Sequence, residues 1–213
     1  MSKTANLRLV DATVPTPIIG TVPPRRRRNA EVRAREHLLP DEVEKLLKVA
    51  GKRSRYGHRD RTMILLAYRH GLRVSELVGL RWRDVDIDHA RMFVRRLKGS
   101  DDGMHPLAGD EQRMLRQLRR DWPSQDHLFL SERGAPVTAA MFRKMLARTS
   151  IEAGLGNLGH PHALRHGCGF ALIDRGIDVR TVQAWLGHRV IAHTVKYTAV
   201  SARRFEIVAG IWG

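Results

Sequence analysis

The stretch His162-Ala163-Leu164-Arg165-His166 lies in a segment with the apolar spacing of a helix. On a helix, His162 and Arg165 are three residues apart and project from the same face, so an imidazole and a guanidinium can converge on one small anion. A guanidinium can bind two oxygens of a phosphate at once, which makes Arg165 a candidate phosphate ligand. Taken alone, an arginine in a strongly basic protein is more often an ordinary surface residue, so other parts of the chain have to support this interpretation.

Three further stretches concentrate reactive side chains. They are Gly71-Leu72-Arg73-Val74-Ser75-Glu76-Leu77, Leu97-Lys98-Gly99, and Leu186-Gly187-His188, with Tyr197 nine residues after His188. The glycine before His188 suits the end of a helix, a position that presents the following side chain without committing it to a core. Tyr197 in isolation would more often be a packing residue. The order and spacing of the four stretches together favour one shared site.

Hydrophobic periodicity predicts a mainly α-helical domain with a small three-stranded antiparallel sheet. Helices are expected over residues 39–50, 60–70, 74–80, 109–121, 138–149, 162–175 and 178–186. Strands are expected over residues 84–87, 91–97 and 104–107. We expect Gly51 to end the first helix, Asp178 to cap the start of the last one, and Gly71 and Gly187 to cap helix C-termini.

Composition restricts the class of protein. The 213 residues carry 38 Lys and Arg against 22 Asp and Glu, a net charge of +16, and 42% are hydrophobic. This hydrophobic content is enough for a core, which excludes a wholly disordered basic protein. The positive charge indicates a polyanionic partner, because neutralising phosphates releases counterions. No apolar run reaches the length of a membrane span and the N-terminus lacks a signal peptide, so we expect a cytoplasmic protein associated with the bacterial nucleoid, with no membrane partner.

Residues 1–36 have the composition of a flexible basic arm. They hold eight Lys and Arg against three Asp and Glu, four prolines before residue 25, and a run of four arginines, Arg25, Arg26, Arg27 and Arg28. This run is a candidate DNA contact or a solvated patch, with neither interpretation favoured. In the helix expected over 138–149, Lys144 and Arg148 share an outward face that either enters a DNA groove or faces solvent.

Together, the four stretches resemble the signature of the tyrosine recombinases, or phage integrases: an Arg within G-x-R-x-x-E-L, a Lys on a β-hairpin, H-x-x-R, L-G-H and a Tyr nine residues further on. The resemblance covers about residues 37–205. It is strongest toward the fimbrial phase-switch recombinases, small inversion enzymes that lack the separate N-terminal domain of larger relatives. The stretches that carry this closer likeness are Arg96-Leu97-Lys98-Gly99, His105-Pro106-Leu107, residues 160–172 and residues 186–199.

The resemblance implies a catalytic domain over residues 37–204 in which Tyr197 is the nucleophile. It would attack a DNA phosphodiester, forming a 3′-phosphotyrosyl link and releasing a 5′-hydroxyl. Arg73 and Arg165 would hold the non-bridging oxygens of the scissile phosphate. Physical chemistry favours such a set, because a tyrosine with a pKa of about 10 needs a base or nearby cations to react at neutral pH. Fixed guanidinium groups would also stabilise the charge that develops on the phosphoryl oxygens.

The same resemblance implies roles for four more residues. Lys98 would protonate the departing 5′-oxygen, His162 would assist deprotonation of the nucleophile, and His188 would hydrogen-bond the phosphate. Glu76 would orient its neighbours without touching DNA. One departure from the family pattern is the turn Ser100-Asp101-Asp102-Gly103, where larger members continue the hairpin with basic residues.

No cofactor and no metal are expected. The chain has neither a Gly-rich phosphate loop nor the paired carboxylates of a two-metal nuclease. His160, His162 and His166 lie close in sequence, but no acidic residue separates the last two and the sole cysteine is Cys168, which argues against a zinc site. Cys168 is expected to be a small buried side chain.

The predicted function is therefore a metal- and ATP-independent site-specific DNA recombinase that inverts, integrates or excises DNA. The alternatives are a type IB topoisomerase-like relaxing enzyme and a non-catalytic DNA-binding regulator of the same fold; the presence of all six catalytic positions argues against the regulator. Expected partners are double-stranded DNA, further copies of the chain in a tetrameric synapse of two dimers, and accessory DNA-bending proteins. The apolar tail 205–213 would dock on a neighbouring subunit, as in the family, or pack on its own domain.

Overall fold

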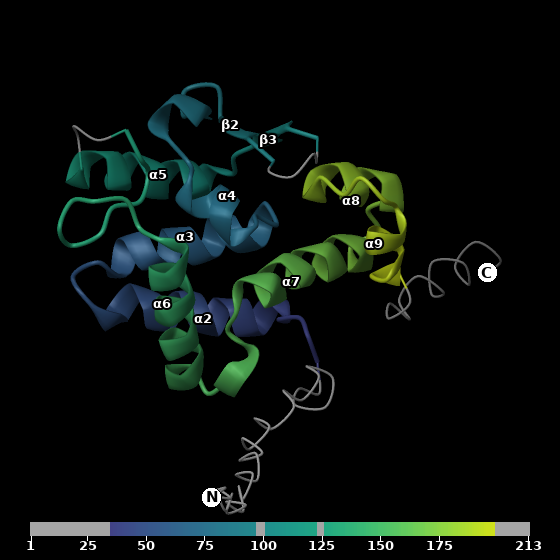
Figure 1. Ribbon diagram of the computed structural model, residues 1–213, viewed down its shortest axis with the longest axis horizontal. Coiled ribbons are helices and arrows are strands. Elements are labelled where there is room, and N and C mark those ends of the chain that lie inside the picture. The colour runs from purple at the N-terminus through teal and green to yellow at the C-terminus, as the bar shows by residue number, and fades with distance from the viewer. Residues whose placement is uncertain (1–34, 97–100, 123–125, 199–213) are drawn as a thin grey trace, which may run out of the picture.

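The computed structural model describes residues 35–96, 101–122 and 126–198 of the 213-residue chain (Figure 1). Its elements follow in the order α2 (Pro40–Arg53), α3 (Gly57–Arg69), α4 (Val74–Val78), β1 (Val85–Asp86), β2 (Arg91–Val94), β3 (Gly103–Pro106), α5 (Gly109–Asp121), α6 (Ala139–Glu152), α7 (Pro161–Asp174), α8 (Val179–Leu186) and α9 (Ala192–Val195). Short 3-10 helices, η1 (Trp82–Asp84) and η2 (Gly156–Leu158), precede β1 and α7. None of these helices has both the length and the apolar character that crossing a membrane requires.

Helix α3 lies at the centre of the core because its sequence is apolar on every side. Five consecutive residues, 63–67, are buried. A helix that is apolar all round has to be covered on all sides, and α2, α5 and α7 pack against it. In α2, Val43, Leu46 and Leu47 form the facing stripe at helical spacing. These contacts build the larger core of the described residues.

The sheet has the order β1-β2-β3 with both pairs antiparallel, which confirms the predicted fold class. Met92 lies opposite His105, and Val94 lies opposite Gly103. The first two strands are shorter than predicted: β1 covers only Val85–Asp86, and β2 ends at Val94 and not at residue 97. The reason is local: the backbone N–H of Arg96 donates to the side chain of Asp102 at 2.6 Å, so it does not continue the ladder.

The predicted capping residues are confirmed for α8, but the predicted end of α2 is wrong. The Asp178 side chain accepts hydrogen bonds from two backbone N–H groups of the first turn, and Gly187 ends α8 with a left-handed φ of 63°. The prediction that Gly51 ends α2 is wrong, because the helix continues to Arg53. A glycine within a helix costs only about 1 kcal/mol, and basic residues in the last turn interact favourably with the helix dipole.

Helices α7, α8 and α9 form a smaller unit at one side of the molecule, next to the sheet (Figure 1). Its own small core consists of Cys168, Ile173, Val182, Leu186 and Tyr197. Cys168 is buried, as predicted. Sequence periodicity does not predict α9, because a helix of four residues is too short to show a helical period.

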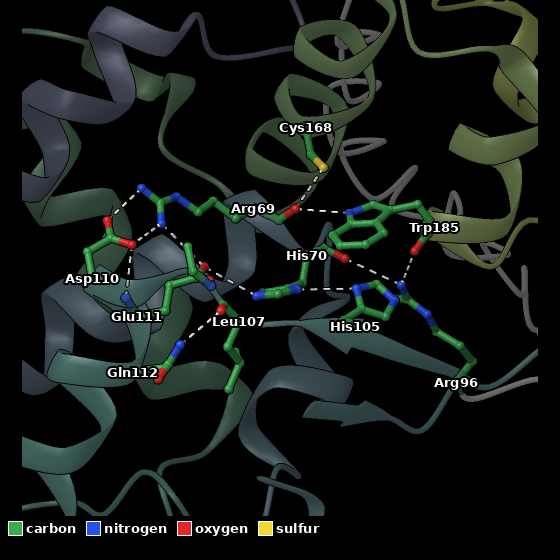
Figure 2. Close-up of polar contacts among 11 residues, drawn as sticks. Arg69, His70, Arg96, His105, Leu107, Asp110, Glu111, Gln112, Cys168 and Trp185 are labelled. Atoms are coloured by element: carbon green, nitrogen blue, oxygen red, sulfur yellow. Dashed lines mark hydrogen bonds and ion pairs between the residues drawn. The ribbon is translucent and has the colours of Figure 1, made fainter. Parts of the chain in front are cut away.

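A buried polar cluster joins the sheet to the helices (Figure 2). His70, which follows α3, places its Nδ1 3.2 Å from Nδ1 of His105 in β3 and its Nε2 3.2 Å from a carboxylate oxygen of Glu111 in α5. Trp185 of α8 packs on His105 with ring centroids 4.0 Å apart, and it donates its indole N–H to the carbonyl of Arg69. The cluster therefore holds β3 and α8 against the end of α3.

We predict that His105 makes the protein lose stability in mild acid. Burial, and then the neighbouring His70 and Arg96, lower the pKa of His105 from 6.5 to about 3. Below pH 6.5 the unfolded chain binds a proton that the folded chain does not, so the free energy of unfolding falls as the pH drops toward 3. At about pH 5 this residue alone should remove on the order of 2 kcal/mol.

Urea denaturation of the wild type and of His105→Gln at about pH 7.5 and about pH 5 measures this contribution. The variant should lose about 2 kcal/mol less on acidification than the wild type, because the carboxylates and the other histidines titrate in both proteins. Equal losses in the two proteins would contradict the prediction.

Candidate active site

Arg165 is a buried cation that two separate elements hold in place. The residue is 4% exposed, and its guanidinium donates to the backbone carbonyl of Gly71 and, at 2.6 Å, to that of Leu186. These carbonyls belong to the turn between α3 and α4 and to the end of α8. Burial, and then the nearby Arg73 and Arg96, lower the pKa of Arg165 to about 10, so the group is still charged at neutral pH. Arg165 is thus a fixed positive charge with N–H donors left for an anion.

Glu76 connects two guanidinium groups behind the predicted phosphate site. Its side chain is 1% exposed, and its two oxygens accept hydrogen bonds from Arg73 and Arg96, each at 2.7 Å. The backbone N–H of Arg73 also donates to Glu76 at 2.9 Å. Burial alone would raise the pKa of Glu76, but Arg96 and the hydrogen bonds from Arg73 hold it below its usual range. This ionised carboxylate orients Arg73, whose side chain is 30% exposed.

Arg96 is absent from the predicted site, although the sequence contains a signal for it. Met92, Val94 and Arg96 are alternate residues, and alternation along a strand places all three on one face. The first two are buried apolar residues, and Arg96 continues that face as a buried charge. Besides its carboxylate partner, it donates to the carbonyls of His70 and Trp185 (Figure 2). Arg96 thereby ties the strand that leads into the hairpin to α4 and α8.

Tyr197, the predicted nucleophile, lies two residues after the end of α9 and is completely buried. Its exposed fraction is 0%, and Phe170 packs edge-on against its ring with centroids 5.0 Å apart. The ring passes so close to α7 that a Cβ at Gly169 would lie 2.6 Å from it. Burial raises the pKa of Tyr197 to about 12, although the charge of Arg165 acts in the opposite direction. The hydroxyl lies 3.0 Å from Nδ1 of His166.

His188, just after α8, is stacked on the same tyrosine. The ring centroids of His188 and Tyr197 are 6.3 Å apart, with the planes inclined by 25°. Nδ1 of His188 is 2.9 Å from the hydroxyl of Thr194 in α9. Burial, and then Arg165 and Arg73, lower the pKa of His188 to about 3. At neutral pH His188 is therefore an uncharged imidazole.

A cavity of about 1000 Å³ lies between α4, α6 and the start of α7. Arg73, His162 and Arg165 line it, so the structure brings these three predicted residues together. His162 is exposed, and partial desolvation and then Arg165 and Arg73 lower its pKa. His166 also lines the cavity and connects it to the hydroxyl of Tyr197.

Sequence reasoning assigns no role to His166. The residue lies four positions after His162, so the helical spacing places both on one face of α7. The spacing does not reveal that the tyrosine hydroxyl reaches that face, because this depends on how α9 packs on α8 and how Tyr197 packs on α7.

Several predicted residues lie outside the described part of the chain. They are Lys98 in the hairpin, the run Arg25 to Arg28, and the tail 205–213. On either side of Lys98 the hairpin is described, and there the carboxylate of Asp102 accepts the hydrogen bond from the backbone N–H of Arg96. An acidic residue of this turn therefore helps to close the hairpin.

The predicted basic face of α6 does not point into the cavity that Arg73 and Arg165 line. Lys144 and Arg148 are exposed, as predicted, but they line a second cavity together with Arg53 and Arg59. The basic residue of α6 that lines the first cavity is Arg143. Residues 143 and 144 are neighbours in sequence, so the helix turns them toward different sides.

This arrangement can bind a phosphate, and it holds a tyrosine hydroxyl against His166, a residue of the cavity. Two guanidinium groups offer several N–H donors to an anion in the cavity and stabilise negative charge that develops there. A tyrosine hydroxyl lies behind the cavity wall, already hydrogen-bonded to an imidazole nitrogen. Across residues 35–96, 101–122 and 126–198, no three His, Cys, Asp or Glu side chains are grouped so as to hold a metal ion.

Comparison with known proteins agrees with this chemistry. The model of the Phage integrase family matches residues 36–204. The chain belongs to the phage integrase family. This tyrosine recombinase is 44% identical over 162 residues to Type 1 fimbriae regulatory protein FimE of Escherichia coli K12, and the match covers 73% of this chain and 80% of the relative. It is 38% identical over 191 residues to Type 1 fimbriae regulatory protein FimB of the same strain, covering 87% of this chain and 94% of the relative.

Among solved structures, the recombinase is similar to the XerH site-specific recombinase bound to palindromic difH substrate in a post-cleavage complex. The TM-score is 0.69 and the identity is 26%. The match covers 87% of this chain and 56% of the XerH chain, so this chain spans about half the length of that protein. The likeness places the helices and the small sheet in the fold of this family.

We predict that Arg96 is indispensable to the stability of the site. Replacing it by Met leaves the Glu76 carboxylate buried with one cation fewer, and breaking a buried pair by removing one partner typically costs about 3–5 kcal/mol. Urea denaturation should show a loss of this size for Arg96→Met. The double variant Arg96→Met with Glu76→Gln should recover part of it, because it leaves no buried carboxylate without a partner.

Arg95→Met is the matched control. Arg95 is the preceding residue, but its side chain is 61% exposed and lies 3.6 Å from Asp84, so its removal should cost less than about 1 kcal/mol. If Arg96→Met costs no more than Arg95→Met, the buried ion pair does not stabilise the recombinase.

Proposed function

We propose that this tyrosine recombinase cuts and rejoins double-stranded DNA at specific sites through a 3′-phosphotyrosyl intermediate on Tyr197. The observation that carries the proposal is that Arg73, Arg165 and His166 line one cavity and that His166 holds the hydroxyl of Tyr197. The match to XerH, named as bound to its difH substrate after cleavage, supports DNA as the partner. The match of the family model to residues 36–204 supports a catalytic domain over residues 37–204.

In the proposed reaction, the scissile phosphate occupies the cavity between Arg73 and Arg165. Because two backbone carbonyls already hold Arg165, its charge stabilises the transition state with little reorganisation. His188 hydrogen-bonds the phosphate and Lys98 protonates the departing 5′-oxygen. The energy of the broken bond is kept in the phosphotyrosine link, so rejoining needs neither ATP nor a metal ion.

The biological outcome that we propose is inversion, integration or excision of DNA, and the similarity to the two fimbrial regulatory proteins favours inversion. Recombination joins two sites, so we place further copies of the chain in a tetrameric synapse of two dimers, with the tail 205–213 docking on a neighbouring subunit. The arm 1–36 would add DNA contacts, and accessory DNA-bending proteins would assist. The reaction would take place in the cytoplasm, at the nucleoid.

Covalent trapping tests the chemistry. Nicked duplexes that tile the DNA flanking the gene of this protein should trap a covalent adduct with the wild type, visible as a slower band in a denaturing gel. Tyr197→Phe should bind DNA but form no adduct, because it lacks the attacking oxygen. Tyr68→Phe is the matched control: its hydroxyl is also buried, but lies on α3 with no hydrogen-bond partner among the described residues, so adduct formation should persist.

Two results would contradict the proposal. If the wild type forms no adduct on any duplex, the chain is a non-catalytic DNA-binding regulator. If it relaxes supercoiled plasmid irrespective of sequence and joins no two sites, it is a type IB topoisomerase-like enzyme.

A second prediction concerns the path of the DNA. Because Arg143 lines the cavity of the proposed phosphate, we expect it to contact a neighbouring phosphate. Arg143→Gln should then lower the slope of log affinity against log salt by about 0.9, the value for one phosphate contact. The joint replacement of Lys144 and Arg148 by Gln tests the basic face predicted from the sequence, for which the expected change is about twice as large.

Fluorescence anisotropy with a labelled duplex of mixed sequence measures these slopes. Arg120→Gln is the control, because Arg120 is exposed on α5 and lines a different cavity. A slope for Arg143→Gln that equals that of the control would show that the DNA does not pass Arg143.

A further inference from the structure

The hydroxyl of Tyr197 contacts a histidine to which the proposed function assigns no chemical step. In the described part of the chain, its hydrogen bond goes to Nδ1 of His166 at 3.0 Å, with the two ring centroids 5.9 Å apart. His188 is stacked on the tyrosine ring, and its Nδ1 is engaged with the hydroxyl of Thr194. The imidazole nitrogen that contacts the reacting oxygen of Tyr197 therefore belongs to His166.

Packing fixes this contact. The backbone N–H of Tyr197 donates to the carbonyl of Thr194 at 3.0 Å, and Phe170 covers an edge of the ring. Gly169 allows the ring to lie directly against α7. His166 is three residues earlier on the same helix, so it lies on the adjacent turn of the surface that receives the tyrosine. The same helix thus positions both partners of the hydrogen bond.

The surroundings of His166 determine which partner carries the proton. Burial is the main reason why the pKa of His166 is lowered to about 4. The charged and titratable groups that face it, and that act in the same direction, are Lys196, His162, Arg165 and His160. At neutral pH the imidazole is uncharged and the phenol is protonated, so the tyrosine donates and Nδ1 of His166 accepts.

A phosphate in the cavity would make His166 a stronger base. His166 lines the cavity together with Arg73 and Arg165, and an anion bound there offsets the positive charge that disfavours the imidazolium. The pKa of His166 should then rise toward its usual value. The proton acceptor would gain strength when the substrate is in place.

We propose that His166 accepts the phenolic proton of Tyr197 when the tyrosine attacks the scissile phosphate. The inference rests on the proposed function and names a catalytic residue for it. The O–H bond of Tyr197 breaks and its proton passes to Nδ1 of His166, while the tyrosine oxygen bonds to phosphorus and the bond from phosphorus to the 5′-oxygen breaks. The 5′-oxygen takes a proton from Lys98 and leaves as a hydroxyl. In rejoining, the 5′-hydroxyl returns its proton to Lys98 as it attacks phosphorus, and His166 returns its proton to the tyrosine oxygen.

This assignment changes the role expected for His162. The centroid of the His162 ring is 6.3 Å from that of His166, and His162 is exposed at the start of α7. His162 remains beside the phosphate as a cavity residue, whereas the contact with the tyrosine hydroxyl belongs to His166.

The test is the single-turnover rate of adduct formation on a nicked duplex that traps the wild type, measured across the pH range. In His166→Asn the side-chain oxygen lies near the former position of Nδ1, so it still accepts the hydrogen bond but takes no proton. We expect His166→Asn and His166→Ala to react about 100- to 10,000-fold more slowly. The wild-type rate should level off above the pKa of His166, whereas the rates of both variants should keep rising with hydroxide concentration.

Two controls separate proton transfer from structure. Added imidazole should restore part of the rate of His166→Ala, because the vacated space borders the open cavity. His162→Asn, a change of the same type four residues earlier, should lower the rate but keep the wild-type pH profile. DNA affinity of His166→Asn, measured by anisotropy, should equal that of the wild type.

A wild-type rate and pH profile in His166→Asn would overturn the inference, and so would a pH profile altered by His162→Asn and not by His166→Asn. If the wild type itself forms no adduct, the proposed function fails and this inference with it. The two failures are distinguishable: an inactive wild type contradicts the proposed function, whereas an active wild type with an equally active His166→Asn contradicts only this inference.

Nitrogen-15 spectra of the imidazole groups add a check without DNA. At neutral pH His166 should carry its proton on Nε2, and Tyr197→Phe should shift the resonance of its Nδ1. A proton on Nδ1 in the wild type would overturn the inference, because that nitrogen could not then accept from the tyrosine.

Discussion

The hydrogen bonds from Arg165 to the carbonyls of Gly71 and Leu186 are the constraint on which the site depends. A guanidinium loses its hydration when it is buried, and fixed polar partners have to replace the water. Here the partners are main-chain atoms at the end of α3 and at the end of α8. One side chain of α7 therefore sets the distance between the segment that leads to Arg73 and the segment that leads to His188. A shift of α7 relative to either of these segments would lengthen hydrogen bonds of a guanidinium that is only 4% exposed.

Burial and the same cations together determine the protonation state of the histidines. Glu76 compensates Arg73 and Arg96 and lies within the field of Arg165, so one carboxylate faces three guanidinium groups. Burial, and then the excess positive charge, lower the pKa values of His162, His166 and His188. Burial and the neighbouring cations thus keep the imidazoles available as hydrogen-bond acceptors. A site with more carboxylates would hold the same histidines as charged donors.

The sequence predicts the long elements well, and its motif spacing selects Arg73, His162 and Arg165, which the structure brings to one cavity. Sequence reasoning fails where tertiary contacts decide. Apolar periodicity is enough for α3 and α8, because one helix face or a whole helix has to be buried. Periodicity cannot predict the end of β2, because the backbone N–H of Arg96 donates to the side chain of Asp102 and not to a neighbouring strand. Motif spacing indicates Arg73, Arg165 and Tyr197 but not His166, because the spacing contains no information on where a buried ring points. Arg96 continues the alternation of the buried residues Met92 and Val94, which predicts that it is buried. Its charge, taken alone, would predict an exposed residue.

The close approach of Tyr197 to α7 has a consequence for the engineering and evolution of this protein. Replacing helical glycines by alanine is a common route to higher stability, because alanine favours the helix by about 1 kcal/mol. Helix α7 contains Gly167 and Gly169, yet a Cβ at position 167 would lie 2.5 Å from the carbonyl oxygen of Leu38, and one at 169 would lie 2.6 Å from the tyrosine ring. Neither position can take this route without moving the chain that it touches. Helix α7, which carries Arg165, is thus kept below its attainable stability by the Leu38 backbone and the Tyr197 ring that pack against it. Substitutions that stabilise the recombinase have to lie elsewhere.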